Sequence, residues 1–170
     1  MANNSISNGG VAIAVSDMEK TREFYETVME QKVIFDLDGY CVGFEGFTLQ
    51  RDYAGLVAGG GVFSKDKTGV KLEIKRKSNN FQLGFEVENF DYWLSKIKSI
   101  EGIEILHDTI EYTWSQRAFR FYDYDKNIVE IGESIESLAK RFLSQGLTVE
   151  EVAKRIQHPI EFVQQFLNSE

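Results

Sequence analysis

The chain has few of the residues that cross-link a protein or anchor it in a membrane. Cys41 is the only cysteine among 170 residues, which excludes an internal disulfide framework and a zinc site built from cysteines. No apolar run approaches the roughly 18–20 residues that a membrane-spanning helix needs. The N-terminal sequence MANNSISNGG lacks the basic start and the apolar stretch of a signal peptide. We therefore expect a cytoplasmic protein with no membrane partner.

Positive charge is also scarce. The chain carries 19 Lys and Arg against 27 Asp and Glu, a formal net charge of −8. General nucleic-acid binding needs a cationic surface that neutralises phosphates, so we expect no nucleic-acid partner. The apolar share of 42% and the aromatic share of 13% are typical of a globular chain. The length then predicts one domain with an appendage.

The sequence does contain an internal repeat. The segments VAIAVSDMEKTREFYETVM at 11–29 and QLGFEVENFDYWLSKIKSI at 82–100 each indicate an apolar strand, an acidic turn and an amphipathic helix. Strand-like sequence follows in both copies, ending in KLEI at 71–74 and VEI at 129–131. Two related modules are therefore expected. Their matched inward-facing positions are Gly10, Glu73, Gln82 and Glu130.

The rest of both copies predicts strands and one long connection. Strands are expected at 31–36, 40–50 and 70–76 in the first copy, and near 103–107, 116–122 and 127–132 in the second. Residues 54–69, rich in glycine and then in charge, indicate either a flexible linker or a lid over a site. The three glycines at 59–61 lack the Lys-Ser/Thr pair of a phosphate-binding loop.

After residue 133 the pattern becomes helical. A first helix is expected at 137–145, a capping box of Thr148 and Glu151 predicts a second, and Pro159 opens a third. The spacing is similar to that of a helix-turn-helix. Acidic residues balance the basic ones, however, and this favours a helical tail that packs on the domain or on a partner subunit over a DNA-binding element.

Three motifs carry a family resemblance. They are VSDMEKTREFYETVM at 15–29, WSQR at 114–117 and FYDYDKNIVE at 121–130. In order and spacing they resemble V-S-D before a helix with F-Y, W-G-x-R, and D-P-D-G-N-x-x-E. These are motifs of the vicinal oxygen chelate superfamily, which includes glyoxalase I, bleomycin-resistance proteins and fosfomycin-resistance enzymes. The chain departs from the last motif at Tyr124 and Lys126, which replace its Pro and Gly.

The resemblance implies an α+β fold. Two βαβββ modules, at 9–77 and 80–133, would form a curved mixed sheet around a cup, and a helical tail would occupy 134–170. It also implies a homodimer that binds a small-molecule ligand or substrate in the cup. Members of the superfamily close the cup within one chain or exchange modules across a dimer, and both arrangements stay open here.

The resemblance also implies site residues. Metal-dependent members hold the ion with residues from the first and last strands of the modules, which implies Glu73, Gln82 and Glu130 as metal ligands. Oxygen ligands of this kind suit Mg²⁺, Mn²⁺ or Zn²⁺, whereas a set without imidazole is poor for Fe(II) or Ni(II). Glu130 and Glu73 are the candidate catalytic residues. Trp114 and Arg117 are the candidate substrate-binding residues, through stacking and through an ion pair with an anion.

Two functions stay open. In the first, a divalent ion would polarise the vicinal oxygens of a small carbonyl substrate, and a carboxylate would exchange a proton with carbon, as in lactoylglutathione lyase or an epimerase. In the second, the cup would bind or sequester a small molecule without a metal, as bleomycin-resistance proteins do. Gly10 provides no side chain, and neither histidine occupies a matched position, which counts against glyoxalase I activity itself. His107 is interpreted as a surface residue, with a general base as the alternative.

Overall fold

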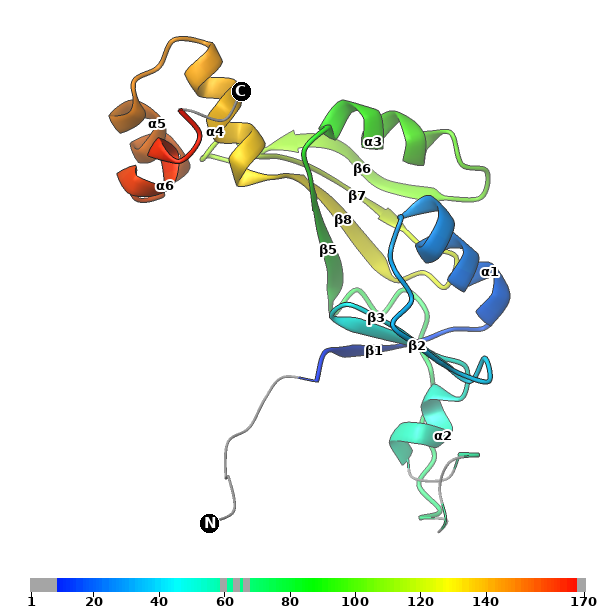
Figure 1. Ribbon diagram of the computed structural model, residues 1–170. Coiled ribbons are helices and arrows are strands. Elements are labelled where there is room, and N and C mark those ends of the chain that lie inside the picture. Colours follow the sequence, from blue (N-terminus) through cyan, green and yellow to red (C-terminus); the bar gives the residue numbers. More distant parts are fainter. Residues whose placement is uncertain (1–8, 59–60, 63–64, 66–67, 168–170) are drawn as a thin grey trace, which may run out of the picture. The chain divides into compact units, whose positions relative to one another are not determined.

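The computed structural model describes residues 9–58, 61–62, 65 and 68–167 of a chain that divides into two compact units, Met1–Arg76 and Lys77–Glu170. Each unit contains one four-stranded mixed sheet with a helix between its first and second strands (Figure 1). The second unit also contains the C-terminal helices. The predicted α+β class, with two βαβββ modules and a helical tail, is confirmed.

The first unit has the strand order β1-β4-β3-β2. Its strands are β1 (Val11–Ala14), β2 (Phe35–Leu37), β3 (Cys41–Phe44) and β4 (Phe47–Gln50). The helix α1 (Met18–Glu23) is capped by the Asp17 side chain and continues into a π-helix, η1 (Phe24–Val28). The fully buried ring of Tyr25 packs against Phe44 and Phe47, and so η1 closes the core of this unit. A short helix, α2 (Tyr53–Ala58), follows β4.

Two strand predictions for the first module are wrong. Residues 68–75 have no regular secondary structure. β4 already pairs with β1 on one side and with β3 on the other, so the last strand of the module is β4 and not 70–76. The single strand expected at 40–50 is a hairpin that turns at residues 45–46. The expected loop or lid at 54–69 begins with α2 and lies partly outside the described residues.

The second unit repeats this topology with the strand order β5-β8-β7-β6. Its strands are β5 (Gln82–Val87), β6 (Glu104–Glu111), β7 (Arg117–Tyr122) and β8 (Ile128–Glu133). The helix α3 (Phe90–Lys98), capped by Asn89, covers one face, where the Phe90 ring meets that of Phe119. Side chains alternate between the two faces of a strand. Arg120 and Glu130 therefore lie on the face away from α3.

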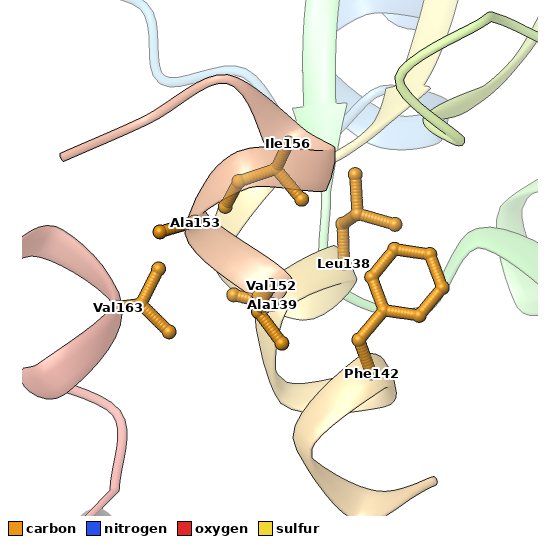
Figure 2. Packing of buried hydrophobic residues seen from close by; sticks show 7 residues of the cluster. All are labelled: Leu138, Ala139, Phe142, Val152, Ala153, Ile156 and Val163. Atoms are coloured by element: carbon orange, nitrogen blue, oxygen red, sulfur yellow. The ribbon is translucent and has the colours of Figure 1, made fainter. Parts of the chain in front are cut away.

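The tail forms three helices, α4 (Ile135–Ser144), α5 (Val149–Ile156) and α6 (Ile160–Gln164). Thr148 and Glu151 make the expected capping box at the start of α5. The three helices enclose a hydrophobic core of their own (Figure 2), formed by Leu138, Ala139, Phe142, Val152, Ala153, Ile156 and Val163. Within the described part of the chain, every helix is too short or too polar to cross a membrane.

Candidate functional site

A polar cluster centred on Arg120 lies on the face of the second sheet that α3 does not cover. Arg120 Nε donates to Gln82 Oε1 at 2.8 Å, and Nη2 donates to the Tyr112 hydroxyl at 2.6 Å and to the Glu130 carboxylate. Nη1 lies 3.1 Å from His107 Nε2. We call these five residues the Arg120 cluster. The Arg120 and Glu130 side chains are 18% and 21% exposed, so both charges are largely removed from water.

Strand register brings the cluster together. Arg120 on β7 lies directly opposite Glu130 on β8 and His107 on β6. Gln82 lies two residues before Gly84, the β5 residue that pairs with Glu130. The turn between β7 and β8 sets this register. There Asp123 Oδ1 accepts backbone hydrogen bonds from Asp125 at 2.9 Å and from Asn127 at 2.8 Å.

The partners of His107 define its tautomer. Nδ1 lies 2.7 Å from the backbone oxygen of Asp108, which only accepts hydrogen bonds. Nδ1 therefore carries the proton in the neutral ring, and Nε2 accepts from Arg120, whose guanidinium only donates. The interpretation of His107 as a surface residue was incomplete, because its half-buried ring belongs to the Arg120 cluster.

A pair of stacked aromatic rings adjoins the cluster. The Tyr112 and Trp114 rings lie 4.5 Å apart between centroids and 9° from parallel. Trp114 Nε1 donates to Gln116 Oε1 at 2.9 Å, and Gln116 Nε2 donates to the backbone oxygen of Glu133 at 2.8 Å. The indole is therefore fixed at its polar edge, and the half-buried pair is joined to the Arg120 guanidinium through the Tyr112 hydroxyl.

Arg117 has a different environment from the one expected of a substrate-binding residue. It lies on the face covered by α3, with its guanidinium 4.6 Å from the Phe90 ring centroid. Nη2 is 3.2 Å from Glu133 Oε1, and Nη1 is 3.1 Å from Asp91 Oδ1. Arg117 and Arg120 are three residues apart in one strand, and an odd separation places them on opposite faces. The contacts of Arg117 tie β7 to the end of β8 and to α3.

The buried carboxylate of Glu133 joins two arginines. Besides Arg117, it accepts from Arg141 Nη2 at 3.0 Å. Burial alone would raise the pKa of Glu133, but the hydrogen bonds from Arg141 and Arg117 outweigh burial and lower the pKa below its ordinary value. The ionised form is therefore the one that this structure stabilises.

The first module carries different chemistry at the corresponding positions. When β1–β4 is superimposed on β5–β8 through the repeat, Thr48 corresponds to Glu130, because Ala12 pairs with Thr48 as Gly84 pairs with Glu130. In the same way Gly43 corresponds to Arg120. A Cβ atom on Gly43 would lie 2.2 Å from Phe35 Cε1, so the Phe35 ring covers this glycine.

Within the second unit, the structure brings together the two matched positions that this unit contains. Gln82 and Glu130 share Arg120 as a partner, whereas Gly10 and Glu73 belong to the first unit. Glu73 is exposed in the irregular segment, and its predicted place on the last strand of the module was wrong. Among the described residues, no three His, Cys, Asp or Glu side chains gather to hold a metal ion.

Sequence reasoning missed Arg120 and Tyr112. A signal for Arg120 was present, since a tight turn centred on Asp125 places residue 120 opposite residue 130 in an antiparallel pair. The sequence contains no such signal for Tyr112. The register between β6 and β7 shifts along the strands, so counting residues from the turn does not show that Tyr112 lies near Arg120.

Comparison with known proteins identifies relatives of this architecture. The family model described as glyoxalase-like domain matches residues 9–136. A protein of unknown function from Agrobacterium tumefaciens str. C58 is 25% identical, with a TM-score of 0.61 over 78% of this chain and 97% of that one. Lactoylglutathione lyase from Agrobacterium tumefaciens is 16% identical, with a TM-score of 0.55 over 79% and 96%.

A third similar structure contains a metal. A mutant of the fosfomycin resistance protein FosX from Listeria monocytogenes, complexed with Mn(II) and 1S,2S-dihydroxypropylphosphonic acid, is 18% identical. Its TM-score is 0.50 over 80% of this chain and 97% of that one. A search of curated proteins finds no match. At these identities the likeness to the lyase and to FosX concerns the fold.

Proposed function

Since this chain belongs to the glyoxalase-like domain family, we propose that it binds a small organic molecule at the Arg120 cluster, without a divalent metal ion there. The observation that carries this proposal is the position of one guanidinium. Arg120 contacts both Gln82 and Glu130, the two residues of the second module that a metal would need. This favours the metal-free alternative of the two functions that the sequence left open.

A divalent cation does not fit the cluster as it is built. A guanidinium stays protonated at any ordinary pH, so Arg120 is a fixed positive charge. It pairs with the Glu130 carboxylate and takes the Gln82 oxygen as an acceptor. A divalent ion on these oxygens would lie beside a like charge in a partly buried site, where repulsion is stronger than in water. Metal-dependent chemistry through Gln82 and Glu130 would require Arg120 to leave both.

The cluster offers a ligand both hydrogen bonding and a flat apolar surface. Arginine has five N–H groups. Among the described residues, the contacts to Gln82, His107, Tyr112 and Glu130 use four of them, leaving one on Nη1. The neighbouring Tyr112–Trp114 pair provides a surface for stacking. We expect a planar, conjugated ligand with a hydrogen-bond acceptor on its edge.

Metal titration tests the absence of an ion at this cluster. Metal-stripped protein is titrated with Mn²⁺ and Zn²⁺, alongside Glu130→Gln and Arg120→Met. We expect wild-type protein to bind neither ion stoichiometrically, because Arg120 already neutralises Glu130. One equivalent of metal bound by the wild type and lost in Glu130→Gln would contradict the proposal and support the metal-dependent lyase or isomerase.

A fragment screen tests the ligand class. Planar heteroaromatic fragments are screened against a Trp93→Phe variant, in which Trp114 fluorescence reports binding. Losing one hydrogen bond from a charged donor costs about 1.5–3 kcal/mol, so Arg120→Met should weaken a true ligand about tenfold or more. Lys98→Met is the control, because it removes a charge that pairs with exposed Asp108 on the same unit. If a fragment binds Arg120→Met and Lys98→Met equally tightly, Arg120 is not part of its binding site.

A further inference from the structure

The turn between β6 and β7 holds a residue in a conformation that its side chain disfavours. Ser115 has φ of 71°, in the left-handed region, and it is 4% exposed. Its backbone N–H donates to Tyr112 O at 2.8 Å. The left-handed conformation is unfavourable for a residue with a Cβ, because the Cβ comes too close to the following carbonyl oxygen. The surrounding structure must therefore hold this turn in place.

Two arginines of the tail donate hydrogen bonds to Ser115 and stabilise this turn. Arg141 of α4 donates from Nη2 to the backbone oxygen of Ser115 at 3.1 Å. Arg155 of α5 donates from Nε to Ser115 Oγ at 3.2 Å. Both guanidinium groups also lie over the ring of Phe142, at 5.0 and 4.6 Å from its centroid. Phe142 belongs to the core of the tail (Figure 2), so the helices themselves fix both arginines.

A second connection runs from the tail to the indole. Arg141 also binds Glu133, with Nε 3.1 Å from Oε1. The backbone oxygen of Glu133 accepts from Gln116, which in turn accepts from Trp114. The tail therefore reaches the aromatic pair through the Ser115 turn and through Glu133. The Tyr112 hydroxyl then completes the connection to Arg120.

We propose that the C-terminal helices are a positioning element for the ligand-binding face. Arg141 and Arg155 clamp the Ser115 turn and thereby set where the Tyr112–Trp114 pair lies beside Arg120. The relevance to ligand binding rests on the function proposed above, whereas the clamp itself is a property of the unliganded chain. Arg141 and Arg155 act through the turn and are positioning residues, not ligand contacts.

Fluorescence quenching tests the clamp without any ligand. In the full-length Trp93→Phe protein, Trp114 is the only tryptophan left of two. We expect Arg155→Met to raise the acrylamide quenching constant of Trp114 roughly twofold, because release of the turn opens it locally. Methionine keeps the apolar stem against Phe142 and removes the hydrogen bond. Lys154→Met, at an exposed position of the same helix, is the control and should leave quenching unchanged.

Three further variants keep the test decisive. Arg141→Lys retains the charge near Ser115 and Glu133 and should give a smaller rise than Arg141→Ala. Ser115→Ala removes only the Oγ contact and should match Arg155→Met. If Arg155→Met and Ser115→Ala quench like Lys154→Met, the clamp is overturned. That outcome is independent of the metal titration, which tests the proposed function alone.

Discussion

Replacing Glu133 by glutamine is expected to lower the free energy of unfolding of the second unit by about 3–5 kcal/mol, the cost of breaking a buried ion pair. The carboxylate is 2% exposed and binds Arg117 and Arg141 together. An amide removes the negative charge that both guanidinium groups bind and turns an N–H₂ group toward one of them. Urea unfolding at neutral pH, followed by tryptophan fluorescence, measures the loss.

The same variant should change how stability depends on pH. The pKa of Glu133 is lowered in the folded state from an ordinary value of 4.5, because the hydrogen bonds from Arg141 and Arg117 outweigh the opposing effect of burial. Below about pH 4.5 the unfolded chain therefore binds the proton more readily than the folded chain. The stabilisation is fully present above that pH and is lost as pH falls through the lowered pKa. The difference between wild type and Glu133→Gln should shrink over this range.

A matched control separates this network from ordinary surface charge. Glu136 pairs with Lys140 at 2.6 Å, but both side chains are 42% exposed. An exposed pair of this kind contributes about 1 kcal/mol or less, so Glu136→Gln should have a small effect. A pH-independent difference between wild type and Glu133→Gln, or a loss no larger than that of Glu136→Gln, would contradict the role of the buried carboxylate.

Replacing Leu138 by alanine should destabilise the tail by about 2–5 kcal/mol, because it removes buried methyl groups and leaves a cavity. Leu138 is fully buried in the core shared by α4, α5 and α6 (Figure 2). Urea unfolding followed by circular dichroism gives the loss. Leu167→Ala is the control, since that side chain is 53% exposed and surface substitutions usually change stability by about 0.5 kcal/mol or less.

The shape of the Leu138→Ala transition carries further information. Arg141 and Arg155 tie the tail to the Ser115 turn, so we expect the tail and the second sheet to unfold together in one transition. An early loss of helix content that precedes the fluorescence change in Leu138→Ala, but is missing in wild type and in Leu167→Ala, would show that the tail melts alone. In that case the tail could not hold the turn at the denaturant concentrations between the two midpoints.

The repeat predicted most of the fold because its signals are local. The alternation of apolar residues, the acidic turn before each helix and, in the tail, the capping box at Thr148 each depend on a few adjacent residues. The failed strand at 70–76 shows where such signals end. Its alternating Val, Leu and Ile suit a strand, but a strand also needs a partner, and β4 already holds the position beside β1 where the last strand of a module pairs. Pairing is a property of the whole sheet, which the local pattern does not contain.

The candidate site was predictable only in part, for a related reason. The repeat pointed to Gln82 and Glu130, and the structure joins them through Arg120. The identity of the group between them depends on cross-strand register, which requires the turn at Asp123 to be counted correctly. Arg117 looked like an anion ligand by resemblance, but strand periodicity places it toward α3, where Asp91 and Glu133 bind it. The tail contacts the Ser115 turn through residue pairs that are 26 and 40 positions apart in the sequence, which local patterns do not reveal.

The positions of the two tryptophans have a consequence for every optical measurement on this protein. Trp93 lies on α3 and Trp114 beside the Ser115 turn, so both report on Lys77–Glu170. Met1–Arg76 contains no tryptophan. Tryptophan emission therefore does not report on the unfolding of that unit. A fluorescence-monitored unfolding curve is therefore the curve of one unit. Its coincidence with far-ultraviolet circular dichroism, which detects both units, becomes a direct measure of whether the duplicated halves unfold as one cooperative body.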